Sequence, residues 1–138
     1  MAAAAVRYLV QRPGGVYVDA TVGAGGHSRA ILAAAGPSGR VVAMDRDPAA
    51  LVVSADALRE HAEAVMFRPG RFDELEAVLD ALGVSVVDGL VYDLGVSSMQ
   101  LDTAARGFSV RADGPLDMRM DTTQPITAAA LVNQWSES

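Results

Sequence analysis

The chain has 138 residues, of which 51% are hydrophobic and 20% charged, and this balance is typical of one globular domain. Its formal charge of −6 is unlike that of domains that bind nucleic acid through phosphates, which are usually basic. The sequence has no cysteine, which excludes disulfides and thiolate metal sites, so we expect a cytoplasmic protein without a bound metal. Charges and glycines interrupt every apolar run well before ~18 residues, so we expect no membrane-spanning helix.

Short apolar runs alternate with helical patterns in the first two thirds of the chain. We expect four strands, at residues 16–20, 41–44, 64–67 and 87–92, and three helices between them, at residues 29–35, 48–61 and 72–82. The strands are apolar throughout rather than alternating, so helices should cover both faces of a parallel sheet. The sequence therefore predicts an α/β fold, a doubly wound parallel sheet of Rossmann type.

The pattern changes after Gly95. Residues 95–125 show little periodicity but hold many polar side chains, and a stretch of this kind is often functional. Residues 128–135 have the pattern of the beginning of a helix. Four strands are few for this fold, and the fourth would be left as a bare edge. We therefore interpret the sequence as incomplete and expect the chain by itself to be poorly stable.

The loop at residues 23–28, Gly-Ala-Gly-Gly-His-Ser, follows the first strand, where ligands bind in doubly wound sheets. Glycines let a ligand approach the backbone, and the first amides of the next helix can bind a carboxylate or phosphate. Asp45, about twenty residues further on, is placed to accept hydrogen bonds from ribose hydroxyls. These features indicate an adenosine-containing cofactor, either NAD or S-adenosylmethionine. Ser28 stands where the dinucleotide fingerprint has its third glycine, which weakens the NAD interpretation.

Two polar residues beside this loop have two interpretations each. His27 is either a first-turn residue bonded to nearby backbone or a contact to the polar methionine end of a cofactor. Asp19 is either a strand-end residue that accepts from backbone amides or a contact to that same end. The residues alone leave both alternatives open.

Four stretches carry a more specific pattern: D-A-T-V-G-A-G-G-H-S at 19–28, D-R-D-P at 45–48, D-L-G-V-S-S-M-Q-L-D at 93–102, and R-G-F-S at 106–109 leading to D-G-P-L-D-M-R-M-D at 113–121. In this order and spacing they resemble the signature of the RsmH (MraW) methyltransferase family. The resemblance runs from about Gly15 to the end of the chain. The family's usual N-terminal segment and its C-terminal half, with the last strands of the sheet, have no counterpart here.

The resemblance implies a class I methyltransferase Rossmann-like domain with an inserted helical domain. Residues 1–125 would be the N-terminal part of the S-adenosylmethionine-binding domain, and residues 126–138 the start of the inserted domain. The implied activity is methylation of the N4 amino group of a cytosine in 16S rRNA of the small ribosomal subunit. Basic residues that bind RNA would lie in the missing half, which would account for the acidic charge. The oligomeric state stays open.

The resemblance also implies a cofactor site, made of Gly25, Gly26, His27, Asp45, Phe72, Asp93 and Gln100. Asp45 would hold the ribose, Phe72 would lie near the adenine, and Asp93 and Gln100 would complete the site. From the residues alone, Phe72 is a core aromatic on a helix face and Gln100 a loop residue in solvent.

A cytosine N4 amine is a poor nucleophile, so its lone pair must be turned toward the methyl group. Asp93, at the end of the fourth strand, is the catalytic residue we expect to accept a hydrogen bond from this amine. Many amino methyltransferases have Asp/Asn-Pro-Pro-aromatic here, whereas this chain has Asp-Leu-Gly-Val, so Asp93 serving the cofactor is the alternative. Asp113, Asp117 and Arg119 could shape the pocket for the base or form a salt bridge that stabilises their loop.

Two other functions compete with this interpretation. One is an NAD-binding oxidoreductase domain, against which the missing third glycine and the motifs after Asp93 count. The other is a truncated, inactive fragment of the methyltransferase, and whether the chain alone is active stays open.

Overall fold

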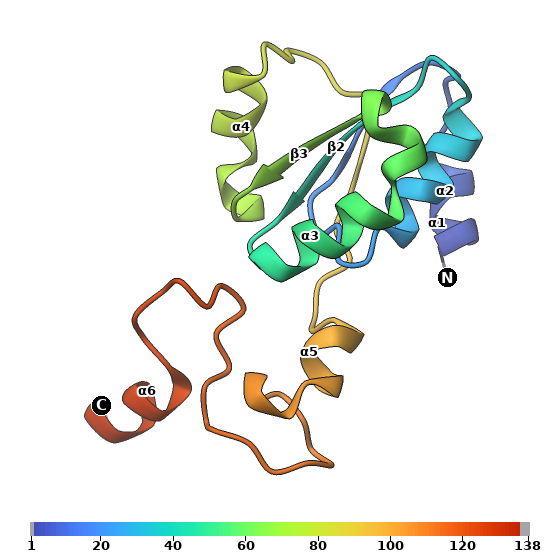
Figure 1. The fold of residues 1–138 in the computed structure, drawn as a ribbon. Coiled ribbons are helices and arrows are strands. Elements are labelled where there is room, and N and C mark those ends of the chain that lie inside the picture. Colours follow the sequence, from blue (N-terminus) through green and yellow to red (C-terminus); the bar gives the residue numbers. More distant parts are fainter. Residues whose placement is uncertain (1, 136–138) are drawn as a thin grey trace. The chain divides into compact units, whose positions relative to one another are not determined.

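A computed structural model of the chain describes residues 2–135 (Figure 1). The chain divides into two compact units, residues 1–93 and 94–138. The domain boundary expected after residue 125 stays a prediction. Between residues 2 and 135, no helix has the length and apolar character needed to cross a membrane.

The first unit contains a sheet of four parallel strands, β1 Val16–Asp19, β2 Arg40–Asp45, β3 Val65–Pro69 and β4 Gly89–Val91. Their order in the sheet is β3-β2-β1-β4. The chain therefore moves outward from β1 to β3 and then returns to the other side of β1, which is the reversal that defines a switch point in a doubly wound sheet. The predicted fold class is confirmed, and the strand ends differ from the predicted ones by at most two residues.

Six helical segments accompany the strands in this unit: α1 Ala2–Leu9, α2 Gly26–Ala35, α3 Pro48–Ala57, η1 Arg59–Ala64, η2 Phe72–Glu74 and α4 Leu75–Ala81. The start of α3 is as predicted, with Pro48 in the first turn and the Asp47 carboxylate accepting from the Ala49 amide at 3.0 Å. The predicted helix to His61 is too long, because Leu58 leaves α-helical geometry and turns fully into the core, and the 3₁₀ segment η1 follows.

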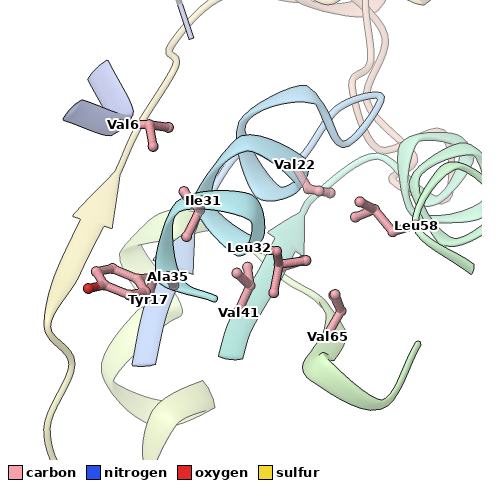
Figure 2. Close-up of a cluster of buried hydrophobic side chains, with 10 residues drawn as sticks. Val6, Tyr17, Val22, Ile31, Leu32, Ala35, Val41, Leu58 and Val65 are labelled. Carbon is pink, nitrogen blue, oxygen red and sulfur yellow. The ribbon is translucent and has the colours of Figure 1, made fainter. Parts of the chain in front are cut away.

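Two hydrophobic clusters cover the two faces of the sheet. On one face, Tyr17 and Val41 pack with Ile31 and Leu32 of α2 and with Val6 of α1 (Figure 2). On the other face, the strand residues next in sequence, Val18, Val42 and Met44, pack against residues of α4 and its surroundings. Because alternate residues of β1 and β2 point to opposite faces and both sets are buried, these strands have to be apolar throughout.

Three further elements of the first unit differ from the sequence prediction. The helix α1 was not predicted, because a run of alanines carries no periodicity, yet its Val6 is buried. The helix α2 begins at Gly26 rather than Arg29, since Gly25 in left-handed conformation is its N-cap. Strand β4 is shorter than predicted at both ends: the Asp88 carboxylate accepts from the Val16 amide at 2.8 Å before the strand begins.

The second unit contains α5 Ser98–Asp102, the 3₁₀ segment η3 Ala104–Arg106 and α6 Ala128–Gln134. The last of these confirms the helix predicted near the end of the chain. The expectation of little helix between residues 95 and 125 was wrong for α5, where Ser97 and Gln100 form a capping box. This motif satisfies amides at the helix start and stabilises a helix too short to show a periodic pattern.

A network around Arg119 orders the loop before α6. Its Nε and Nη2 atoms donate to the two carboxylate oxygens of Asp117 at 2.9 and 2.7 Å, and its Nη1 donates to the carbonyls of Thr122 and Gln124. Arg106 in turn donates from Nη2 to the carbonyl of Arg119 at 2.9 Å. Of the two roles left open for Asp117 and Arg119, the structure shows the loop-stabilising salt bridge.

The ion pair predicts how acid affects the second unit. Hydrogen bonds from Arg119 hold the pKa of Asp117 at about 2, below its ordinary value of 3.8. Since the folded-state pKa is the lower one, the contribution of the pair to stability is present above pH 3.8 and is lost as the pH falls toward 2. We expect Asp117→Asn to flatten the acid dependence of unfolding across this range. Amide hydrogen exchange of residues 116–134 reports on the opening of this unit.

The exposed Asp113→Asn is the control for this measurement and should keep the wild-type acid profile. An Asp117→Asn profile identical to that of the wild type between pH 4 and 2 would show that the ion pair does not stabilise the loop.

Candidate functional site

The loop after β1 is fastened to the two strands beside β1. The Val22 amide donates to the Met44 carbonyl of β2 at 2.8 Å, and the Ala20 amide donates to the Val91 carbonyl of β4 at 3.1 Å. The loop therefore lies at the carboxyl ends of β1, β2 and β4. This is the edge at which doubly wound sheets bind ligands.

Gly25 and Gly26 form the junction between this loop and α2. Gly25 has φ +82°, and a Cβ there would lie 3.2 Å from the buried side chain of Leu58. At Gly26 a Cβ would meet nothing within 4 Å, so the first residue of the helix faces open space. The first amides of a helix have no acceptor within it. The junction can therefore bind an anionic group that approaches the backbone closely.

Asp45 is the last residue of β2, and its carboxylate binds the backbone of the glycine loop. Its Oδ2 accepts from the Gly23 amide at 2.9 Å, and its Oδ1 accepts from the Asp47 amide at 3.0 Å. Each carboxylate oxygen has two lone pairs, so each keeps one acceptor site for a further donor. The side chain is partly buried rather than closed off. This arrangement suits a pair of neighbouring hydroxyls.

Asp19 and Ser28 form a buried pair beneath the loop. Both are fully buried, and the Ser28 hydroxyl donates to Oδ2 of Asp19 at 2.7 Å. Burial raises the pKa of Asp19, although hydrogen bonds from Ser28 and Thr21 and the nearby His27 oppose this effect. Of the two interpretations of Asp19, the structure shows the one in which it accepts from neighbouring groups of the chain. The hydrogen bond to Asp19 also gives Ser28 a role at the position where the dinucleotide fingerprint has its third glycine.

His27 and Asp93 come together from α2 and from the end of β4. The His27 Nδ1 lies 3.7 Å from Oδ2 of Asp93, and the Asp93 amide donates to the Thr21 hydroxyl at 2.8 Å. The Asp93 side chain is 66% exposed, whereas that of His27 is 19% exposed. The carboxylate thus lies near the histidine and is largely open to solvent.

Phe72 and Tyr92 form an aromatic pair at the same edge. Their ring centroids are 5.7 Å apart with an interplanar angle of 82°, and the residues are 44% and 43% exposed. Phe72 is therefore not the core aromatic on a helix face that the residues alone suggested. Tyr92 was not among the predicted site residues, and the only signal in the sequence was an aromatic residue at the end of the fourth strand.

Gln100 belongs to the second unit. It is 4% exposed, and its Oε1 accepts from the Ser97 amide at 3.0 Å, so it is not the solvent-exposed loop residue that the residues alone suggested. Its place in a cofactor site stays a prediction. The structure thus brings together Gly25, Gly26, His27, Asp45, Phe72 and Asp93 within one unit.

The fold and this edge define the class of protein as a Rossmann-like α/β domain with a glycine-rich loop and an acidic residue at the end of its second strand. The chain belongs to the MraW methylase family, whose model matches residues 1–138.

Similar proteins carry the name ribosomal RNA small subunit methyltransferase H. The relative from Geobacter sulfurreducens is 54% identical over 137 residues, which are 99% of this chain and 44% of the relative. The relative from Thiobacillus denitrificans is 57% identical over 129 residues, 94% of this chain and 40% of the relative. The chain thus spans less than half the length of the curated relatives it matches. In fold, it is similar to the crystal structure of a candidate rRNA methylase from Clostridium thermocellum, with a TM-score of 0.60, 21% identity, and coverage of 69% of this chain and 50% of that one.

Proposed function

We propose that this chain is the cofactor-binding part of an S-adenosylmethionine-dependent methyltransferase that modifies the N4 amino group of a cytosine in small-subunit 16S rRNA. The observation that carries the proposal is the Asp45 carboxylate bound to the glycine loop, with one acceptor site left on each oxygen. Membership of a methylase family supports methyl transfer. The names of the relatives support rRNA of the small subunit as the substrate.

The residues at this edge fit S-adenosylmethionine. The Gly25 amide already donates to the Val22 carbonyl at 2.7 Å, so the amide of Gly26 would bind the carboxylate of the methionine part. The open space beside Gly26 admits that group, and Gly25 shapes the turn that leads to it. Asp45 would accept from the two ribose hydroxyls. Phe72, with an exposed ring at the same edge, would contact the adenine. His27 and Asp93 would then lie toward the methionine end.

When bound, S-adenosylmethionine supplies a methyl group already activated on a sulfonium. The work of the protein is then to orient the amine. The Asp93 side chain is 66% exposed, so its carboxylate is open to accept a hydrogen bond from the N4 amine. That bond turns the nitrogen lone pair away from the ring and toward the methyl group, and the carboxylate can accept the proton that the amine loses.

The target cytosine has to leave its stack to reach Asp93, since its amine is otherwise covered. The formal charge of −6 predicts that this chain contributes recognition of the base rather than affinity for phosphates.

The residue at position 28 counts against the competing NAD-binding function. The third glycine of a dinucleotide fingerprint allows close packing of helix on strand. Here that position holds a buried hydroxyl that donates to Asp19. No feature of residues 2–135 favours a dinucleotide over S-adenosylmethionine.

A chimeric enzyme tests the proposal. In it, this chain replaces the matching 44% of the Geobacter sulfurreducens relative. We expect the chimera to transfer methyl groups from S-adenosylmethionine to small-subunit rRNA, with N4-methylcytidine as the product in nucleoside analysis. Asp93→Ala in the chimera should lower kcat by 10²-fold or more, the range for loss of a group that transfers a proton. A folded chimera that makes a different methylated nucleoside, or none where the relative is active, would refute the proposal.

A further inference from the structure

We infer that Tyr92 is a positioning residue for the adenine ring of the proposed cofactor and acts through Phe72. The inference rests on the proposed function, since it needs an adenosine cofactor at this edge. It adds a second aromatic residue, which follows the strand at the opposite edge of the sheet and restricts the orientation of the Phe72 ring.

The backbone of Tyr92 is held on both sides. Before it, the Val91 carbonyl accepts from the Ala20 amide at 3.1 Å, and after it, the Asp93 amide donates to the Thr21 hydroxyl at 2.8 Å. Both partners belong to the loop after β1. The ring of Tyr92 therefore projects from a position that is fixed relative to the proposed cofactor loop.

Phe72 follows the strand at the opposite edge of the sheet from Tyr92. It opens η2 after β3, whereas Tyr92 follows β4, and the order β3-β2-β1-β4 puts two strands between them. The edge-to-face contact of the rings therefore spans the carboxyl ends of β1 and β2, where Asp19 and Asp45 lie. A half-exposed phenylalanine has several accessible rotamers, and contact with a fixed ring selects among them.

The exposure of the pair indicates a ligand rather than core packing. Each residue keeps more than two fifths of its surface in solvent even though the rings touch. In an edge-to-face pair, one ring offers its edge and so leaves its own faces free of the partner. A flat nucleobase stacks on such a face, and stacking of this kind depends on how well the ring is held.

The test is a double-mutant cycle with Tyr92→Leu and Phe72→Leu, read as the Kd of S-adenosylhomocysteine by calorimetry on the 138-residue chain. Leucine keeps apolar bulk but removes the ring. We expect each single variant to weaken binding about 2- to 10-fold, the size of one aromatic contact. The double variant should be weaker by clearly less than the product of the two effects. Tyr92→Phe should bind within about 2-fold of the wild type, because the ring contact is kept.

Two controls separate positioning from a general structural effect. Tyr8→Leu removes an aromatic residue that is 80% exposed on α1 and should leave the Kd unchanged. S-ribosylhomocysteine lacks the adenine, so Tyr92→Leu should not alter its binding. Circular dichroism checks that each variant is folded.

The inference is overturned if Tyr92→Leu binds S-adenosylhomocysteine like the wild type, if the two effects multiply, or if S-ribosylhomocysteine is affected equally. In each of these results the wild type still binds, so the proposed function survives. A wild-type chain that does not bind S-adenosylhomocysteine would instead overturn the proposed function and this inference together.

Discussion

Gly25→Val is expected to abolish S-adenosylmethionine binding while the sheet of the first unit stays folded. Gly25 has φ +82°, a conformation that a β-branched residue resists, and forcing it costs about 1–3 kcal/mol. The Cβ of the new side chain would also lie 3.2 Å from the side chain of Leu58. Leu58 is fully buried, so it cannot move away without disturbing the core. The loop must therefore shift, and the amides of α2 shift with it. Calorimetry gives the loss of binding, and circular dichroism gives the retained fold.

Gly83→Val is the matched control for this variant. Gly83 also has a positive φ, +67°, but a Cβ there meets nothing within 4 Å, and it lies after α4, away from the loop. Its substitution should cost a similar conformational free energy and leave the affinity intact. If Gly25→Val bound S-adenosylmethionine as tightly as Gly83→Val does, the loop would be an ordinary turn.

Asp45→Ala should weaken S-adenosylmethionine binding by about 1.5–3 kcal/mol, the range for hydrogen bonds to a charged group. Two causes contribute: the ribose hydroxyls lose their acceptor, and the Gly23 and Asp47 amides lose theirs, which loosens the loop. Calorimetry with S-adenosylhomocysteine and its 2′,3′-dideoxy analogue separates these causes. The part due to the ribose should disappear with the analogue, whereas the part due to the loop should remain.

Asp80→Ala, which removes an exposed carboxylate of α4, should bind both ligands like the wild type. A folded Asp45→Ala variant with wild-type affinity for S-adenosylhomocysteine would mean that the ribose lies elsewhere. It would also remove the observation on which the proposed function depends.

The candidate site residues whose place in the fold the sequence predicts are those positioned by neighbours along the chain. Gly25 and Gly26 follow directly from a strand, a glycine loop and a helix start in succession. Asp45 could be placed because the carboxyl ends of adjacent parallel strands meet at one edge. In both cases the geometry depends on short segments and on a general rule of parallel sheets.

The contacts that the sequence did not predict depend on the order of strands or on elements too short for a pattern. Phe72 and Tyr92 follow strands at opposite edges of the sheet, β3 and β4, and their rings nevertheless meet, which no spacing along the chain reveals. The helix α5 has five residues and cannot show a helical period, although its Ser97 and Gln100 already form a readable capping box.

The central claim is that this edge of the sheet binds S-adenosylmethionine, and calorimetric titration of the 138-residue chain with S-adenosylmethionine and with NAD tests it most directly. We predict saturable binding of one S-adenosylmethionine per chain and no heat of binding for NAD under the same conditions. Saturable binding of NAD, or no binding of S-adenosylmethionine by a folded chain, would contradict the account.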